Sequence, residues 1–556
     1  MQILSSTRAF ARLALLAAAA AFLAAPAPAP APAQAPDFSP EAFRAHVAFL
    51  ADDLLEGREP GTRGYDLAAR YVATRLEALG LRPAGEDGSW YQQVPLVRHG
   101  LGGSPTLSAA EVTIRHGEGA FFRATGGSEA LALDAPAVFA GHGIDLPARG
   151  FDDYRGLDVR GKVVVVLPGV PNGTPSDVGA HLQSDKARMA ALRGAIGLIE
   201  LRPASNRPPS PALLAALSRP VTAVADPAGN PVTDAPGLRF SVSLEIPQAL
   251  RLFAGDSARL QQAGARAAAG QRVRGFQLRR PLRITHDAPP ARTAFTSPNV
   301  VAVLPGSDPA LAGEYVVLMA HLDHLGIRQS GDPASDRIRN GAMDNATGIA
   351  TLIEVARQMS EAGNRPRRSI LFAAVTAEEL GLLGAQHLAS NPVVDGRIVG
   401  LVNLDMPVLT YNFTDVIAFG AEHSTLGPIV RRAAAGMGVA LTDDPLPEQG
   451  LFTRSDHYMF VQKGIPSVFL MTGFAGEGER RFREFLGTRY HSPADDLTLP
   501  FDWGAGARFA ELNYRIAREI ADSEQAPLWY RDSFFGHVFA PRADKARRPA
   551  PPVNGG

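Results

Sequence analysis

Five residues in the second half of the chain carry side chains that zinc takes as ligands, and each lies in a short motif. The five are His321, Asp344, Glu379, Asp405 and His491, in VVLMAHLDHLG, NGAMDNATGIA, LFAAVTAEELGLLGA, IVGLVNLDMP and TRYHSPADD. Each segment reads as the end of a buried strand, and a hydrophobic run that stops at an acid or a histidine places that side chain at a sheet edge. We therefore expect the five side chains to line one cleft.

The residue types of this set favour two metal ions rather than one. Zinc binds imidazole nitrogens and carboxylate oxygens, and a paired site needs one carboxylate that spans both ions. Each ion would take a histidine, an acid and one oxygen of a shared aspartate. Three carboxylates and a bound hydroxide would balance the four positive charges, so the buried cluster can be neutral.

Acids next to two of these residues are candidates for supporting roles. Glu378 and Glu379 are adjacent, so one can bind a metal ion while the other faces water, or both can lie at the exposed first turn of the following helix. Asp323, two residues after His321, is placed to accept the second ring N–H of that histidine. His324 is interpreted as a polar surface residue.

The composition narrows the class of protein. The chain has 556 residues, more than a single hydrophobic core holds, so we expect two or three domains. Its 55 Lys and Arg against 56 Asp and Glu give a formal net charge of -1, which provides no electrostatic reason to expect a nucleic-acid partner. It has no cysteine, so its stability must come from core packing and metal binding.

Residues 1–33 have the pattern of a signal peptide. Arg8 and Arg12 precede an apolar run from Leu13 to Ala25, and cleavage is predicted before Gln34. The run is too short to predict a membrane span, and an uncleaved anchor is the alternative. We expect a periplasmic or secreted protein with no membrane association after removal of the signal.

The hydrophobic pattern predicts an α/β fold. Ser39 and Pro40 predict the start of a first helix, and a second helix ends near Gly80. From Pro298 onward strand-like and helix-like segments alternate, which predicts a three-layer α/β/α sandwich with a mixed, centrally parallel sheet. Between 135 and 265 short β-type runs predict a separate β-rich unit.

In this order, MAHLDHLG, GAMDNATG, TAEELGLLGA, NLDM and YHSPADD closely resemble the motifs of the aminopeptidase Y-like zinc metallopeptidases. This family includes bacterial leucyl aminopeptidases and glutamate carboxypeptidase, and the resemblance covers about residues 38–525. It implies two zinc ions per chain, with His321 and Asp405 on one ion and Glu379 and His491 on the other. Asp344 would bridge the two ions.

The resemblance also implies roles for residues around the ions. Glu378 would be the general base, and Tyr490 would hydrogen-bond the oxyanion, although Tyr490 is otherwise an ordinary packed aromatic. Asp323 and Asp495 would support the metal ligands from behind. The implied reaction removes N-terminal residues from a peptide substrate by attack of a metal-bridging hydroxide.

By the same resemblance, region 135–265 is similar to a protease-associated domain. It would be inserted between residues 38–134 and 266–525 of a peptidase domain, with a C-terminal extension at 526–556 that is frayed at its end. Asp456 and His457 match a family segment near the substrate, and a structural role is equally open for both.

Other activities remain open at this point. A carboxypeptidase of the glutamate carboxypeptidase type needs a basic pocket, which Arg454, Arg480, Arg481 and Arg483 are available to form, unless they belong to an exposed loop. A glutaminyl cyclase would have the same fold but a single zinc ion. A binding protein with an inactive peptidase fold would have lost some of the ligands. Oligomeric state and side-chain preference are not determined by the sequence.

Overall fold

The computed structural model describes residues 37–126, 130–205, 218–286, 288–289, 291–329, 332, 334–361 and 363–549. The predicted signal peptide lies outside these residues. Among the helices in this part of the chain, none combines the length and the apolar character needed to cross a bilayer.

A ten-stranded mixed sheet carries the candidate site. Its order is β12-β2-β16-β18-β17-β19-β22-β20-β21, and β1 pairs with β16 outside this path. The central strands β18, β17, β19 and β22 are parallel, whereas β16 and β20 flank them in antiparallel orientation. The predicted mixed, centrally parallel sheet is confirmed. The strands are β1 (Arg82–Pro83), β2 (Tyr91–His99), β12 (Val221–Val224), β16 (Arg292–Leu304), β17 (Glu314–His321), β18 (Ser369–Val375), β19 (Arg397–Leu404), β20 (Asp415–Phe419), β21 (Ala440–Thr442) and β22 (Ser467–Thr472).

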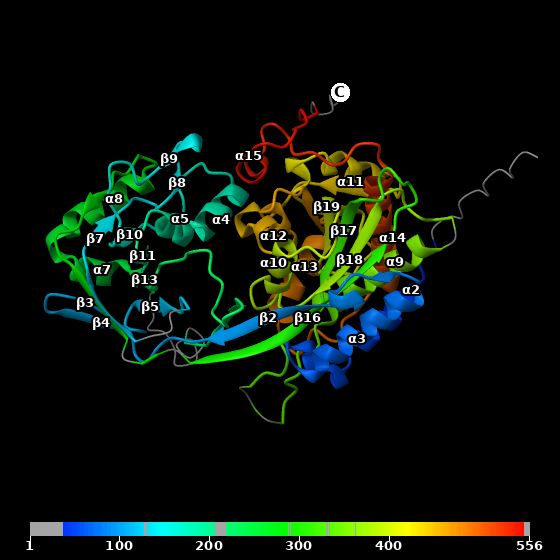
Figure 1. The fold of residues 1–556 in the computed structure, drawn as a ribbon, viewed down its shortest axis with the longest axis horizontal. Helices are drawn as coiled ribbons and strands as arrows, with labels where there is room; N and C mark the ends of the chain where they lie inside the picture. The colour runs from blue at the N-terminus through cyan, green and yellow to red at the C-terminus, as the bar shows by residue number, and fades with distance from the viewer. Residues whose placement is uncertain are drawn as a thin grey trace, which may run out of the picture. The chain divides into compact units, whose positions relative to one another are not determined.

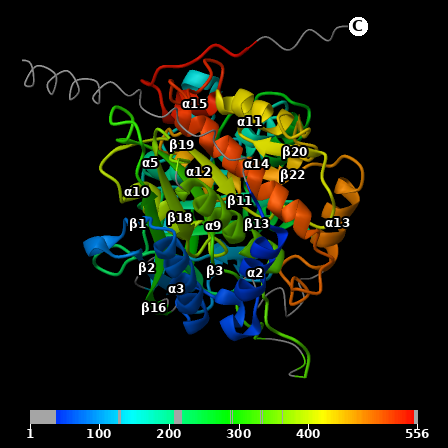
Figure 2. The ribbon, with the colours of Figure 1, turned by 90° about the vertical axis from the view of Figure 1, so that its right-hand side faces the viewer.

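Helices cover both faces of this sheet, as the sequence predicted. Figure 2 looks onto the face covered by α2 (Pro40–Leu50), α3 (Arg63–Ala78), α9 (Thr347–Ser360) and α14 (Trp503–Asp522). α10 (Leu383–Ser390) and α12 (His457–Val461) pack on the opposite face. Along β17, Leu318 belongs to the core under α9, while Val317 and Met319 belong to the core under α10 and α12. This alternation follows from the two-residue repeat of a strand.

Local sequence explains where several helices begin. The Ser39 side chain accepts hydrogen bonds from the N–H groups of Glu41 and Ala42, and Pro40 occupies the first turn of α2. Thr62 and Asp502 accept in the same way at the starts of α3 and α14. Each cap satisfies N–H groups that have no partner within the helix.

A β-rich lobe is connected to the main sheet through β2 and β16, which pair antiparallel from Tyr91 to His99 and extend beyond the helices that cover the main sheet (Figure 1). The lobe contains a six-stranded sheet, β14-β7-β10-β11-β13-β5, and a four-stranded sheet, β4-β3-β15-β6. It therefore includes strands on both sides of the predicted segment 135–265, while β12, inside that segment, pairs with β2 of the main sheet.

The elements of the lobe are short. Its strands are β3 (Thr106–Ala109), β4 (Val112–Arg115), β5 (Ala120–Arg123), β6 (Leu131–Ala135), β7 (Ala137–Phe139), β8 (Asp145–Leu146), β9 (Phe151–Asp152), β10 (Val163–Val166), β11 (Gly197–Arg202), β13 (Phe240–Glu245), β14 (Phe276–Gln277) and β15 (Leu282–His286). Its helices are α4 (Ser176–Ser184), α5 (Lys186–Leu192), α7 (Ile246–Leu252) and α8 (Ser257–Ala268).

Part of the C-terminal extension packs against the main layers. It contains α15 (Phe534–Phe539), and Trp529 and Phe535 are buried. Residues 541–549 lie within the stretch that the composition predicts to be frayed. The structure instead pairs Ala546 with Tyr530 and places Arg548 2.7 Å from Asp532.

Candidate metal centre

One group of ligand-type side chains lies at the carboxyl ends of β17 and β19. His321 is the last residue of β17, and Asp405 directly follows β19. Nε2 of His321 lies 3.2 Å from Oδ1 of Asp405 and 3.3 Å from Oδ1 of Asp344. Because β17 and β19 are parallel neighbours, their carboxyl ends place His321 and Asp405 at the same edge of the sheet.

A second group shares Asp344 with the first. Nε2 of His491 lies 3.3 Å from Oδ2 of Asp344 and 3.1 Å from Oε2 of Glu379. Glu379 follows β18, and His491 follows α13 (Gly478–Thr488). The two oxygens of Asp344 thus face two different histidines, which is the arrangement expected of a bridging carboxylate.

The spacing of the side-chain atoms in these two groups is suitable for zinc binding. Two ligand atoms on one tetrahedral zinc ion lie about 3.3 Å apart, because each bond is about 2.0–2.2 Å long. The separations of 3.1–3.3 Å around His321 and His491 match that spacing. Oδ2 of Asp344 and Oε1 of Glu379 are buried without a hydrogen-bond partner among the described residues, as expected of atoms that a cation would satisfy.

Asp344 is held in a tight turn that precedes α9. The turn spans Ala342–Ala346 and contains a cis peptide bond between Asp344 and Asn345. The Asp495 carboxylate accepts from the N–H groups of Met343 (2.8 Å) and Asp344 (3.0 Å). Burial raises the pKa of Asp495 to about 6. The predicted supporting residue therefore acts on the backbone that carries Asp344.

Asp323 contacts a different partner from the one that the spacing suggested. Nδ1 of His321 lies 3.1 Å from the backbone carbonyl oxygen of Asp323. The hydrogen-bond partner of the ring is therefore the backbone of Asp323 and not its carboxylate. The carboxylate accepts from the N–H groups of Glu378 (3.1 Å) and Glu379 (3.3 Å), because β17 and β18 are neighbours whose ends face each other. Asp323 thus orients the loop that carries both glutamates.

His324 is buried, so its interpretation as a surface residue is wrong. Its Nδ1 lies 2.7 Å from Oε1 of Glu379 and 3.9 Å from Oδ2 of Asp344. The atoms do not align for a hydrogen bond, and neither ring nitrogen has a hydrogen-bond partner in the part of the chain that the structure describes. The available sequence signal was its position in HLDHLG, three residues after the ligand-type residue His321.

Glu378 and Tyr490 line the cavity that opens at the metal centre. The cavity has a volume of about 610 Å³ and also exposes His321, Asp344 and Asp405. Burial raises the pKa of Glu378 well above the usual carboxyl range, and the neighbouring Asp405 adds to this effect. Burial also raises the pKa of Tyr490, as do the carboxylates of Asp344 and Glu379.

Most of the remaining cavity wall is apolar. It is formed by Leu446, Leu451, Phe469, Met471, Phe482 and Leu486. Of the four arginines considered for a basic pocket, Arg454 and Arg483 line the cavity. Arg483 pairs with Glu479 at 2.9 Å, while Arg480 and Arg481 pair with Glu477 and Glu484 away from the lining.

Asp456 and His457 lie behind the cavity wall. Both are fully buried, and neither belongs to the lining, so their placement does not fit the predicted contact with substrate. Burial lowers the pKa of His457 to about 3. The preceding residue, Ser455, does line the cavity and donates to Oδ2 of Asp405 at 2.5 Å, a contact that the sequence analysis missed.

Arg58 is a second residue that sequence reasoning missed. It comes from the loop between the first two helices, is 1% exposed, and donates to the carbonyl oxygens of Leu322 (2.8 Å), Asn340 and Gly341 (3.0 Å). Burial lowers its pKa to about 10, and Asp495 and Asp323 oppose that shift. This guanidinium joins the two loops that carry Asp323 and Asp344.

Comparison with known proteins finds a family model that matches the segment containing this site. The model of peptidase family M28 matches residues 299–517, which include all five ligand-type residues as well as Glu378 and Tyr490. The matched segment is less than half of the chain. Leupeptin-inactivating enzyme 1 of Streptomyces exfoliatus is 32% identical over 218 residues, which cover 36% of this chain and 44% of the relative.

Further similarities are to a fungal protein and to a solved structure. A probable zinc metalloprotease of Pyrenophora tritici-repentis is 36% identical over 259 residues, 41% of this chain and 58% of that protein. The aligned segments thus span about half the length of the two curated relatives. An aminopeptidase from Aneurinibacillus sp. strain AM-1 is 19% identical, with 92% of this chain and 98% of that chain covered and a TM-score of 0.48.

Proposed function

We propose that this chain is a zinc-dependent exopeptidase, most simply an aminopeptidase that removes N-terminal residues from peptides. The observation that carries the proposal is the pair of ligand groups that share Asp344, at the base of the cavity lined by Glu378 and Tyr490. The match of residues 299–517 to the model of peptidase family M28 supports it.

Five histidine and carboxylate side chains would be the zinc ligands. His321 and Asp405 would hold one zinc ion, Glu379 and His491 the other, and Asp344 would bridge them. When bound, zinc supplies a Lewis acid that polarises a carbonyl group and lowers the pKa of water.

Two side chains of the cavity would handle protons and charge. Glu378, which lies beside the ligands without being assigned to either group, would take a proton from the attacking water and return it to the leaving amine. Tyr490 would donate its hydroxyl hydrogen to the developing oxyanion, and its raised pKa keeps that hydroxyl protonated.

The cavity wall supports a preference for apolar side chains next to the scissile bond. Leu446, Leu451 and Phe482 would remove such a side chain from water, at about 25 cal/mol per Å² of apolar surface buried. A carboxypeptidase is the second candidate, because Arg454 lines the cavity and makes no ion pair with any residue that the structure describes. Its guanidinium is available to a C-terminal carboxylate.

Parallel assays of the purified protein distinguish these activities. Aminoacyl-nitroanilides and free-amine peptides should be hydrolysed, whereas the same peptides with an acetylated N-terminus should not. Cleavage of the blocked peptides from the C-terminus would favour the carboxypeptidase, and cyclisation of N-terminal glutamine with one zinc ion per chain would favour the cyclase. We also propose that the protein acts in the periplasm or outside the cell, and that the β-rich lobe is a protease-associated domain.

A further inference from the structure

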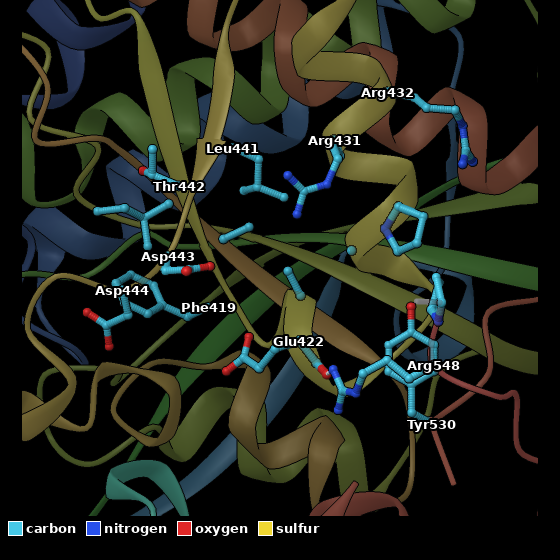
Figure 3. A pocket seen from close by; sticks show the side chains of 16 residues that line it. Phe419, Glu422, Arg431, Arg432, Leu441, Thr442, Asp443, Asp444, Tyr530 and Arg548 are labelled. Carbon is cyan, nitrogen blue, oxygen red and sulfur yellow. Dashed lines mark hydrogen bonds between the residues drawn. The ribbon is translucent and has the colours of Figure 1, made fainter. Parts of the chain in front are cut away.

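A second cavity, with a volume of about 930 Å³, lies at the β21 edge of the main sheet (Figure 3). It is formed by β20, β21, the single-turn helix η7 (Ala421–His423), α11 (Leu426–Ala435) and the C-terminal segment around Tyr530 and Arg548. Its apolar surface comes from Ile417, Phe419, Leu441, Pro428 and Pro549. None of these residues belongs to the metal centre.

The second cavity shares a wall with the metal cavity. Ile417 and Phe419 of β20 pair directly with Met471 and Phe469 of β22. The two β20 residues line the second cavity, and the two β22 residues line the metal cavity. The rings of Phe419 and Phe469 lie 5.2 Å apart. Residues 441–444 line the second cavity, and the same segment continues to Leu446 in the wall of the metal cavity.

The charges of the second cavity favour a cationic ligand. Asp443 has no ion pair or hydrogen bond within the described residues, and Nε2 of His423 lies 3.4 Å from Oε1 of Glu422. Burial raises the pKa of Asp444, and Glu448 and Asp177 raise it further, as expected of acids without a cation among them.

The basic residues of the cavity do not neutralise these acids. Arg432 pairs with Glu519 and points away from the other labelled residues in Figure 3. Arg548 pairs with Asp532 at 2.7 Å. Arg431 extends toward Leu441 and has no ion pair in the described ranges, so the lining contains one unpaired guanidinium and three carboxylates, those of Asp443, Asp444 and Glu422.

We propose that this cavity binds the continuing part of a long peptide substrate, with a lysine or arginine side chain directed at Asp443, Asp444 and Glu422. The inference rests on the proposed peptidase function. β21 is the last strand of the sheet, and an extended peptide can lie along such an edge. Three strand spacings separate β19, which precedes the ligand Asp405, from β21; this is about 14 Å, which an extended peptide crosses in about four residues.

The test compares substrates that differ only beyond the scissile bond. A dipeptide, a hexapeptide with lysines at positions 4 to 6 and a hexapeptide with glutamates there share the same first two residues. For the wild type we expect kcat/KM on the lysine hexapeptide to exceed that on the glutamate hexapeptide by about tenfold. This preference should shrink at high salt, since exposed charges are screened.

The variant Asp443→Lys should remove or reverse this preference while kcat/KM on the dipeptide stays within about twofold. Asp443 is exposed, so the substitution should leave the thermal unfolding temperature unchanged. The matched control is Asp395→Lys, an exposed acid near the start of β19 and therefore at the sheet end opposite the metal centre, which should keep the wild-type preference. Equal rates on both hexapeptides, or an unaltered preference in Asp443→Lys, would overturn the proposal.

A binding measurement separates this inference from the proposed function. Fluorescence polarisation with a C-terminally labelled lysine hexapeptide, whose first amide is reduced, reports binding without cleavage. If no substrate is hydrolysed, the peptidase proposal fails, and binding that is lost in Asp443→Lys still supports the second cavity. Equal binding by wild type and Asp443→Lys rejects it.

Discussion

Nδ1 of His324 lies 2.7 Å from Oε1 of Glu379 in the interior of the metal centre. His324 is thus a sixth side chain of a metal-binding type at this centre, in addition to the five that the motifs identify. Since His324 also lies 3.9 Å from Oδ2 of Asp344, it belongs to the half of the centre that contains Glu379 and His491. It either binds the second ion or fixes the orientation of Glu379.

Replacing His324 should therefore weaken one of the two metal sites. We expect His324→Ala to lower zinc affinity by about 10- to 100-fold at one site, as the loss of an outer partner of a ligand does. Zinc content after dialysis, measured by elemental analysis, should fall from two ions toward one. His387→Ala on α10 is the control and should retain both ions. Full occupancy in His324→Ala would remove His324 from the metal centre.

Glu378→Gln should separate metal binding from turnover. Glu378 lies beside both ligand groups and is assigned to neither, so the variant should bind zinc like the wild type. Loss of proton transfer should lower kcat by about 10²- to 10⁴-fold. The companion variant Glu379→Gln should instead lose zinc. Wild-type turnover in Glu378→Gln would exclude it as the general base.

Removal of metal should abolish activity and lower stability. Without a cation, Asp344, Glu379 and Asp405 form a buried group of carboxylates, which is costly unless it is compensated. After chelation we expect no peptide hydrolysis and a lower unfolding temperature, and addition of zinc should restore both. Elemental analysis should give two ions per chain; hydrolysis by metal-free protein would contradict the assignment.

The β-rich lobe should influence substrate binding through α4. Nε2 of His423 lies 2.6 Å from Oδ2 of Asp177 on α4, and Ala180 of the same helix contacts Gly450 in the segment that lines the metal cavity. We expect Asp177→Asn to raise KM by about three- to tenfold with little change in kcat, equivalent to about 1 kcal/mol.

The control for this prediction stays within the lobe. Asp134→Asn removes a carboxylate that lies 3.4 Å from Arg283 in the four-stranded sheet of the lobe, and it should leave KM unchanged. Steady-state kinetics on one short substrate decides the outcome. A fall in kcat with constant KM would place the effect of Asp177 in the chemical step instead.

Acid should loosen the same interface through His181. Its Nδ1 lies 2.8 Å from the Tyr458 hydroxyl, and Asp185 and Arg188 are the charged groups around it. Burial lowers the pKa of His181 below 6.5, so the unfolded chain binds the proton more readily. The stability that depends on the neutral ring is complete above about pH 6.5 and is lost as the pH falls below it.

Thermal unfolding between pH 5 and pH 8 tests this dependence. Wild type should lose more stability toward pH 5 than His181→Gln, which keeps a side-chain acceptor for Tyr458 but has no proton to bind. Because both proteins carry the same metal centre, the difference between their curves isolates His181. Parallel curves would show that His181 does not contribute.

The sequence alone identified the elements and the residue types of the site. Hydrophobic runs that stop at His321, Asp405 and the glutamate pair predicted strand ends, because a buried strand needs a continuous apolar stretch and its end is the first place for a polar side chain. The same periodicity predicted the layered α/β architecture, and Ser39 and Pro40 predicted the first helix start. These features depend on near neighbours in the chain.

Only the tertiary structure decided which atoms face each other. His324 and Arg58 are buried near the metal ligands. The Asp323 carboxylate accepts from the N–H groups of Glu378 and Glu379. Asp456 and His457 are buried behind the wall of the metal cavity. Similarly, β12 pairs with β2 across more than a hundred residues, so the β-rich lobe does not end where the composition changes. Such contacts depend on strand register and on packing between distant segments, which local spacing does not specify.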